Sequence, residues 1–289
     1  MIQNNNLSVL PWYKDIRQQH HRKNYAYGAI YPLYTPANYL LPFQIIRDTR
    51  NTAITSVRIY DKDGNYVVDV TQYMRETGLQ IVKFESLGYD VIIYPGNLPM
   101  ATNMLDGQYY ATMTDGVDIW YSEMFTIVQD VSGYLKIEWY DEENFVFDAG
   151  IIIYNEPRFK NCLYLCADIG KPDYQFEEEA ETRNGYVFPL KQISNKTYKF
   201  TALAPEYLCD VMRFIRMSDY VVITDKYGRI YKCDTFLITP KWQTQGDLAS
   251  IEIEFTTNTA AKKLGLAYLR PVGGDFNNDY NNDYNNQVG

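Results

Sequence analysis

Short runs that alternate apolar and polar residues recur along most of the chain, and each predicts a β-strand. Leu135–Tyr140 carries Leu, Ile and Trp on one face and Lys and Glu on the other, and Ala249–Phe255 alternates in the same way. A period of two is typical of a strand with one buried face. The other predicted strands are Ile54–Tyr60, Tyr66–Thr71, Leu79–Glu85, Tyr89–Tyr94, Tyr109–Thr114, Ile119–Val128, Asp148–Tyr154, Cys162–Ala167, Tyr220–Ile223 and Arg229–Ile238.

Polar turns that contain glycine separate several of these runs. Asp61–Asn65, Asp115-Gly116 and Asp225–Gly228 each lie between two predicted strands. Gly, Asn and Asp accept the positive φ that tight hairpin turns require. The sequence therefore predicts hairpins around these three turns, and one more strand pair around Leu87-Gly88.

Pro205–Met217 is the strongest helix candidate. Proline suits the first turn of a helix because that turn does not need its N–H. We also expect a short polar helix within Trp12–Lys23 and another that ends at Lys262–Gly265. The apolar residues of the strongest candidate recur at helical spacing: Leu208, Val211, Met212 and Ile215.

These elements predict a mostly-β fold with two domains and extended terminal arms. Residues 1–40 form an N-terminal arm, and 41–131 form a β-sandwich of immunoglobulin-like size, because short strands recur with polar turns between them. Residues 132–270 form a second β-rich domain with one packed helix, an α+β arrangement. Residues 271–289 are a low-complexity tail rich in Asn, Asp and Tyr.

Both arms carry aromatic residues that point to contacts with other molecules. A disordered arm rarely keeps many aromatic residues, so the N-terminal arm is expected to pack extended against its own body or against a neighbouring subunit. The tail is either a flexible polar segment, the favoured interpretation, or a segment that orders on assembly. The predicted contact residues between copies are Trp12, Tyr25, Tyr27, Tyr31, Tyr34, Phe276, Tyr280 and Tyr284.

Composition narrows the classes of function. Aromatic residues make up 16% of the 289 residues, with 28 Tyr, which favours β structure and surfaces that other molecules cover. The net charge of −9 argues against binding of nucleic acid through a broad basic face. The longest apolar runs are far shorter than a membrane span. The first residues show no signal peptide, and four Cys predict reduced thiols rather than a disulfide framework.

Candidate catalytic and metal-binding groups are sparse, so no catalytic residue, metal or cofactor is predicted. The two histidines are adjacent, at His20-His21, which makes a histidine-based nucleophile system improbable. Cys162 and Cys166 lack the partners of a zinc site, and Asp61–Asn65 lacks the distal Glu of a calcium loop. A small basic cluster is expected to be a solvated helix face or a contact with an acidic partner: Lys14, Arg17, Arg22 and Lys23.

Two stretches resemble virion proteins of tailed phages from Bacteroides-type hosts, crAss-like podoviruses among them. Gly107–Val128, with the core Trp-Tyr-Ser-Glu-Met-Phe, resembles the closing hairpin of an immunoglobulin-like module. Tyr231–Phe236 and Trp242–Phe255 resemble the end of the same proteins. The resemblance implies a non-enzymatic structural subunit that forms a homo-oligomeric ring in the neck or tail. Its partners would be other copies of itself and neighbouring tail or portal proteins, in a virion assembled in the host cytoplasm.

Two other functions stay open from the sequence. A carbohydrate-binding β-sandwich protein, either a receptor-binding tail component or a cell-surface glycan module, would present exposed Trp and Tyr in a row. Trp120, Trp139, Trp242 and many tyrosines are the residues that could stack on sugar rings. A glycoside hydrolase would need two carboxylates at a suitable separation. The candidate acids are Asp141, Glu142 and Glu143, and those of the stretch Phe176–Glu181, which is expected to be a loop or an edge strand.

Overall fold

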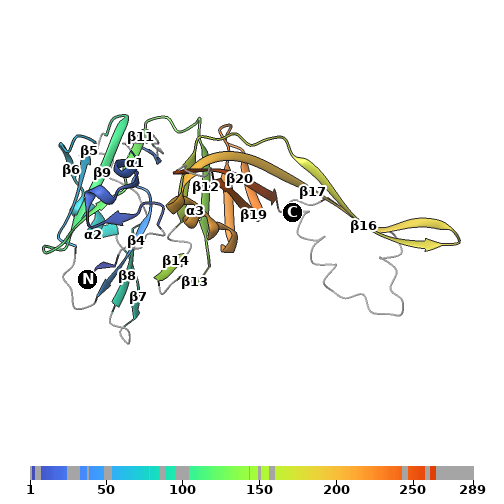
Figure 1. The fold of residues 1–289 in the computed structure, drawn as a ribbon. Helices are drawn as coiled ribbons and strands as arrows, with labels where there is room; N and C mark the ends of the chain where they lie inside the picture. The colour runs from blue at the N-terminus through green and yellow to red at the C-terminus, as the bar shows by residue number, and fades with distance from the viewer. Residues whose placement is uncertain are drawn as a thin grey trace, which may run out of the picture. The chain divides into compact units, whose positions relative to one another are not determined.

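The fold is mostly β, as the sequence predicts (Figure 1). The chain divides into two compact units: Met1–Lys171 with Tyr198–Thr256, and Pro172–Thr197 with Thr257–Gly289. The sequence instead predicts two domains that meet between residues 131 and 132. The computed structural model describes residues 2–3, 8–24, 33–37, 39–48, 54–77, 79–84, 89–94, 104–142, 144–148, 151–155, 160–242, 247–257 and 261–264.

Strand β9 organises the first part of the larger unit. β5 pairs with one edge of β9, and β10 and β11 share the other edge in succession. β6 pairs with β5 across the predicted Asp61–Asn65 turn, and β2 pairs with β10. The bounds are β2 Trp12–Tyr13, β5 Ser56–Asp61, β6 Tyr66–Asp69, β9 Gly107–Thr114, β10 Ile119–Ser122 and β11 Phe125–Val128.

The predicted strand Ile119–Val128 is thus two strands, interrupted at Glu123-Met124. Both residues are buried. The buried positions change phase here, from Trp120 and Ser122 to Phe125 and Ile127, and strand-forming residues on both sides conceal the change in the sequence.

Strand β3 (Tyr34–Pro36) joins the two halves of the sheet. It runs parallel to β11, and Tyr34 also lies opposite Tyr164 of the antiparallel strand β15 (Asn161–Leu165). Hydrogen bonding therefore continues from the first half into the second without a gap. This explains why no unit boundary falls between residues 131 and 132. It also explains why β3, which the sequence assigns to the N-terminal arm, belongs to the sheet.

The second half continues the sheet in the order β15, β12, β18, β19, β20 and the end of β17. β12 matches the predicted strand residue for residue, and its burial alternates as expected. The predicted hairpin at Asp225–Gly228 joins β18 to β19. The bounds are β12 Leu135–Tyr140, β17 Tyr186–Pro205, β18 Tyr220–Thr224, β19 Ile230–Trp242 and β20 Leu248–Thr257.

The predicted helix at residues 205–217 is present as α3 (Glu206–Arg213) followed by the 3-10 turn η4 (Ile215–Met217). Pro205 is the N-cap residue of α3, and its own backbone is extended, with φ at −72°. α3 contacts β19. Its buried residues are Leu208, Cys209, Val211 and Met212.

Smaller elements complete the described part of the chain. A second sheet has the order β1, β4, β8, β7, and β13 pairs with β14. The N-terminal segment contains η1 (Ile16–Gln18) and α1 (His20–Asn24), within the predicted polar helix. The remaining bounds are β1 Ile2–Gln3, β4 Phe43–Asp48, α2 Thr71–Thr77, β7 Leu79–Phe84, β8 Tyr89–Tyr94, β13 Asn144–Asp148, β14 Ile151–Asn155 and β21 Ala261–Leu264.

Two local predictions are wrong. β21 is a strand paired with β17 rather than a short helix, because backbone pairing overrides the weak helical preference of four residues. The predicted strand Asp148–Tyr154 is divided between β13 and β14.

One hydrophobic core extends through the larger unit. Trp120 and Trp139 lie on either side of the predicted boundary, and both are buried in the same cluster. Phe43 of β4 and Tyr94 of β8 stack 4.7 Å apart, and Phe43 also contacts Trp12 at 4.9 Å. The second sheet therefore packs into the same core as β2.

Candidate functional site

A long hairpin of β16 (Asp173–Arg183) and β17 dominates the described part of the smaller unit (Figure 1). Asn184 and Gly185 form its two-residue turn, with φ values of +53° and +80°. Positive φ at both positions is the signature of a type I′ turn, which matches the twist of the flanking strands. Eleven residues of strand extend roughly 36 Å. The sequence signal for this hairpin, Asn-Gly, is present in the chain but absent from our predictions.

One face of the hairpin is apolar and uncovered. Tyr174 and Phe176 lie on this face of β16, and Val187 joins them because it is opposite Thr182. Their exposed fractions are 60%, 74% and 66%. Tyr174 and Phe176 are neighbours on this face, and Val187 lies further along the ribbon, beyond Glu178 and Ala180. Exposed apolar side chains of this size favour an interaction surface.

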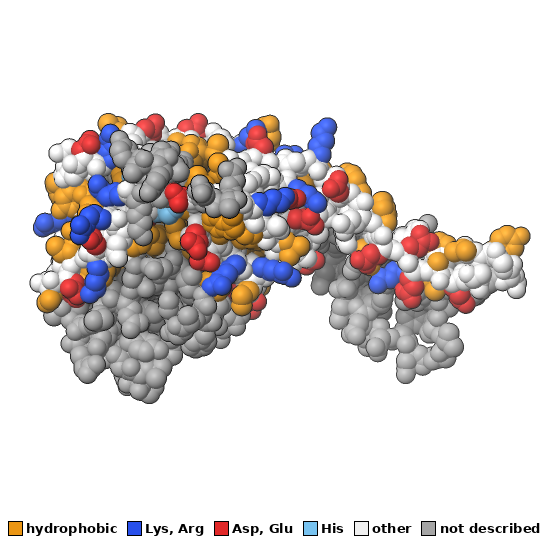
Figure 2. Space-filling model, viewed as in Figure 1, with side chains coloured by type: hydrophobic (Ala, Val, Ile, Leu, Met, Phe, Trp, Pro, Cys, Tyr) orange, Lys and Arg blue, Asp and Glu red, His pale blue; other side chains and the backbone are white. Residues whose placement is uncertain are grey.

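The opposite face carries three acidic side chains, together with Tyr186 near the turn, which is 71% exposed. Glu177, Glu179 and Glu181 alternate along β16, and Figure 2 shows red side chains beside orange ones along this hairpin. β16 is the first strand of the sheet order, and its outer edge has no strand partner among the described residues. Charged residues on an edge strand oppose pairing with an identical edge. The structure thus makes Phe176–Glu181 an edge strand, one of the two expected states.

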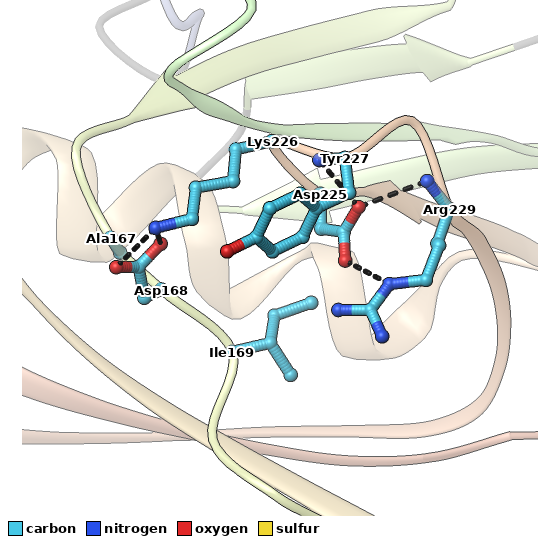
Figure 3. Close-up of a pocket in the computed structure, with 7 residues that line it drawn as sticks. All are labelled: Ala167, Asp168, Ile169, Asp225, Lys226, Tyr227 and Arg229. Carbon is cyan, nitrogen blue, oxygen red and sulfur yellow. Dashed lines mark hydrogen bonds and ion pairs between the residues drawn. The ribbon is translucent and has the colours of Figure 1, made fainter.

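A second feature is a hollow of about 170 Å³ beside the β18–β19 turn (Figure 3). Ala167, Asp168 and Ile169 line one side, and the turn residues line the other. The volume is below the roughly 300–1,000 Å³ of pockets for drug-sized ligands. The hollow therefore suits a single side chain or a small ion rather than a nucleotide.

Asp225 builds the turn that borders this hollow. Its Oδ1 accepts the N–H groups of Tyr227 and Arg229, both at 2.9 Å, and its Oδ2 accepts the Arg229 Nε–H at 2.6 Å. Burial alone would raise the pKa of Asp225, but these hydrogen bonds outweigh it and hold the pKa below its ordinary value. The carboxylate is thus charged and committed to the turn.

Two cations border the hollow from the same turn. Lys226 Nζ lies 2.8 Å from Asp168 Oδ1. Arg229 uses its Nε for Asp225, and its two terminal nitrogens have no hydrogen-bond partner among the residues that the structure describes. Figure 3 shows these nitrogens, the Tyr227 ring and Ile169 around the same space. A guanidinium with free terminal donors is suited to binding a carboxylate.

The N-terminal segment packs against the chain's own body, one of its two expected positions. Trp12 is 2% exposed and lies in the core, which corrects the expectation that this ring anchors a neighbouring copy. Tyr34 is half-buried and contacts Tyr134, with ring centroids 4.6 Å apart. Its role between copies stays a prediction. The other predicted contact residues lie outside the described residues: Tyr25, Tyr27, Tyr31, Phe276, Tyr280 and Tyr284.

A buried carboxylate holds this segment in place. Glu123 Oε2 accepts the His20 N–H at 2.7 Å and the Tyr13 hydroxyl at 3.2 Å, and Oε1 accepts the N–H groups of His21 and Met124. Burial raises the pKa of Glu123, although these four hydrogen bonds act in the opposite direction. The residue joins the N-terminal segment to the interruption between β10 and β11.

The predicted basic cluster is largely engaged inside the chain. Arg17 pairs with Asp15 at 2.8 Å, and Lys14 pairs with Asp118 at 3.3 Å. Arg22 lies over the Tyr110 ring at 5.7 Å. These contacts support the interpretation of a solvated structural face.

The carboxylates considered for hydrolysis serve structural contacts where the structure describes them. Asp141 Oδ1 accepts the Asp219 N–H at 2.7 Å, and Glu142 Oε1 accepts the Tyr220 hydroxyl at 2.6 Å. Glu143 lies outside the described residues. No group of His, Cys, Asp and Glu suited to a metal ion occurs within the described ranges. Within the same ranges, no helix is long and apolar enough to cross a membrane.

Tyrosines do form a row across four strands, as a glycan-binding surface would require. Tyr66 contacts Tyr60 edge-on, Tyr60 stacks on Tyr110 at 5.6 Å, and Tyr110 contacts Tyr121. Only Tyr66 exposes most of its side chain, at 59%. The other rings are buried or half-buried and contact one another, so they offer few open faces for sugar stacking.

The tryptophans considered for sugar binding differ in exposure. Trp120 and Trp139 are buried, and Trp242 is 47% exposed. Glycan binding stays a prediction, without an open row of ring faces to carry it.

Comparison of the chain with known protein families, curated proteins and solved structures found no match. The immunoglobulin-like topology and the phage resemblance therefore stay predictions.

Proposed function

We propose that the chain is a non-enzymatic structural subunit of a tailed-phage virion that assembles into a homo-oligomeric ring in the neck or tail. The phage assignment follows the sequence resemblance in Gly107–Val128 and Trp242–Phe255. The oligomeric assignment is supported by the hairpin of β16 and β17.

The uncovered apolar face of this hairpin carries the proposal. A two-stranded ribbon is marginally stable on its own in water, and β21 adds a third strand to this one along Lys191–Ser194. The register and the Asn184-Gly185 turn nevertheless specify the ribbon in detail. A preformed ribbon with exposed Tyr174, Phe176 and Val187 gains stability when another surface covers those side chains.

The charge pattern favours a head-to-tail contact over a two-fold contact between hairpins. Glu178 lies on the apolar face, at the middle of β16, where it accepts a hydrogen bond from Gln192 at 3.1 Å. Two hairpins packed face to face across a two-fold axis through the middle of β16 would bring their Glu178 carboxylates together. Contact with a different surface of the next copy avoids this repulsion, and heterologous contacts form a ring when the rotation between copies closes.

Light scattering on the purified protein tests the assembly. We expect a closed homo-oligomer for the wild-type chain and a smaller species for Phe176→Asp, since a charge in the apolar face opposes burial. Gln175→Asp is the matched control, because it adds the same charge at the neighbouring position on the opposite face. Both side chains are exposed in the single chain, so neither change should affect folding.

Three results would count against the proposal. A monomeric wild-type protein at every concentration tested would remove the homo-oligomer. Equal masses for the two variants would remove the apolar face as the contact. Absence of the chain from purified virions of a phage that encodes it, by mass spectrometry, would remove the virion assignment.

A further inference from the structure

The hollow beside the β18–β19 turn presents a guanidinium that is bonded through its Nε alone, next to an exposed aromatic ring. Lys226 and Arg229 each have one carboxylate partner, so the four charged groups balance. Beyond this ion pair, the two terminal nitrogens of Arg229 have no hydrogen-bond partner in the described part of the chain. Tyr227 is 72% exposed, and its ring lies 5.3 Å from the Arg229 guanidinium carbon.

This arrangement selects a ligand of a particular chemistry. A carboxylate can accept two parallel hydrogen bonds from the fork of an arginine. An aromatic ring beside that carboxylate can pack on Tyr227, which is 72% exposed. A volume of about 170 Å³ admits the carboxylate side chain alone, and the ring beside it then packs on the exposed outer part of Tyr227. The best ligand is therefore an acidic residue followed by an aromatic one.

The C-terminal tail contains this pair three times at a spacing of four residues. Asp275-Phe276, Asp279-Tyr280 and Asp283-Tyr284 repeat an acidic residue followed by an aromatic one. Residues 271–289 contain no Lys or Arg. The tail thus carries both a carboxylate for the terminal nitrogens of Arg229 and a ring for Tyr227.

We propose that the hollow between Asp168 and Arg229 binds an Asp-aromatic pair from the C-terminal tail of a second copy of this chain. The Asp carboxylate binds the terminal nitrogens of Arg229, and the following ring packs on Tyr227. The choice of a second copy rests on the proposed assembly into a ring. The basic cluster near the N-terminus is a poorer acceptor, because Arg17 already binds Asp15 through Nε and Nη2.

A synthetic peptide of residues 271–289 tests this site by fluorescence anisotropy. The receiver is the full chain with Asp275, Asp279 and Asp283 changed to Asn, so that its own tail does not compete. We expect saturable binding that weakens at least tenfold with Arg229→Gln. Arg216→Gln is the matched control, because Arg216 is exposed on η4 and does not line the hollow.

A second peptide separates the site from general attraction between charges. The same peptide with its three Asp changed to Asn should lose binding to the same extent as Arg229→Gln. Tyr227→Ala should also weaken binding, while the N–H at this position still bonds to Asp225. The inference would be overturned if the Asp peptide did not bind, or if the Asp and Asn peptides bound equally well. It would also be overturned if the receiver bound the Asp peptide equally well with and without Arg229→Gln.

The outcome is separable from that of the proposed function. If the peptide fails to bind and light scattering still gives a closed oligomer, the tail site is wrong and the assembly stands. If the peptide binds to a protein that stays monomeric at every concentration, the hollow is a tail-binding site and the ring is wrong.

Discussion

The hydroxyl of Tyr13 donates a hydrogen bond to the carboxylate of Glu123 at 3.2 Å, across 110 positions of the sequence. Tyr13 belongs to β2, and Glu123 lies where β10 gives way to β11. The buried carboxylate of Glu123 thus holds the N-terminal segment against the interruption between β10 and β11, the two strands that pair with the same edge of β9.

Glu123→Ala should destabilise the larger unit strongly. The substitution removes the acceptor for three backbone N–H groups and one hydroxyl at a buried position. Each buried donor left without a partner costs about 1–3 kcal/mol. Some donors will find water, so we expect the free energy of unfolding to fall by about 3 kcal/mol, as measured by urea denaturation.

Tyr13→Phe is the graded comparison for this experiment. It removes one of the four donors and leaves the carboxylate bonded to the backbone, so it should cost about 1 kcal/mol. A loss equal to that of Glu123→Ala would show that the tyrosine contact, rather than the backbone contacts, holds the segment.

Asp225 should make stability depend on pH in the acid range. Its pKa lies below the ordinary value of 3.8 in the folded chain, so the folded state favours the charged form. The contribution is present above the unfolded pKa and is lost as the pH falls through the folded pKa. Wild-type protein should therefore exceed Asp225→Asn in stability by a constant amount near neutrality. The difference should shrink below pH 3.8, as measured by urea denaturation at a series of pH values.

A difference between the two proteins that stayed constant through the acid range would contradict this assignment. It would mean that the loss in the variant comes from packing of the turn rather than from the charge on Asp225.

Local patterns predict much of this fold, because hairpins are set by neighbouring residues. The β18–β19 turn follows from Asp225–Gly228, with Gly228 at φ +75°. Alternation gives β12 and β20 almost to the residue. The hairpin of β16 and β17 also has a local signal, Asn184-Gly185, but the acidic run Phe176–Glu181 by itself predicts no more than a loop or an edge strand.

Other features depend on contacts that no local pattern contains. Tyr34 lies in a strand only because β11 and β15 approach it from two sides. The burial of Trp12 depends on Phe43 in the other sheet. The pairing of Asp168 with Lys226 joins positions 58 residues apart. Sequence supplies the residue types of the candidate site, and only the fold brings them together.

Gly185→Ala should loosen the hairpin without affecting the larger unit. Gly185 has φ +80° and nothing within 4 Å of an added Cβ, so the cost is backbone strain alone, about 1 kcal/mol. Hydrogen exchange of the β16 and β17 amides should become faster, while exchange in β12 stays unchanged. Gly133→Ala is the control, since it also has open space around it and lacks a positive φ. Faster exchange in both variants would indicate a general effect of replacing glycine.

Deletion of residues 1–40 should unfold much of the larger unit rather than leave the domains intact. The deletion removes β2 from the sheet edge and β3 from between β11 and β15. It also removes Val9, Leu10 and Trp12 from the core, where each is at most 2% exposed. The single substitution Trp12→Ala should already cost about 3–5 kcal/mol, as a large-to-small change in a packed core.

Circular dichroism and thermal unfolding measure both effects. If the truncated chain kept a cooperative transition at the wild-type temperature, residues 8–37 would be an accessory arm after all. Their aromatic side chains would then be available to a neighbouring copy, as the sequence alone suggests. The burial of Trp12 beside Phe43 argues for the opposite result, because a detachable arm does not contribute a fully buried indole to the core.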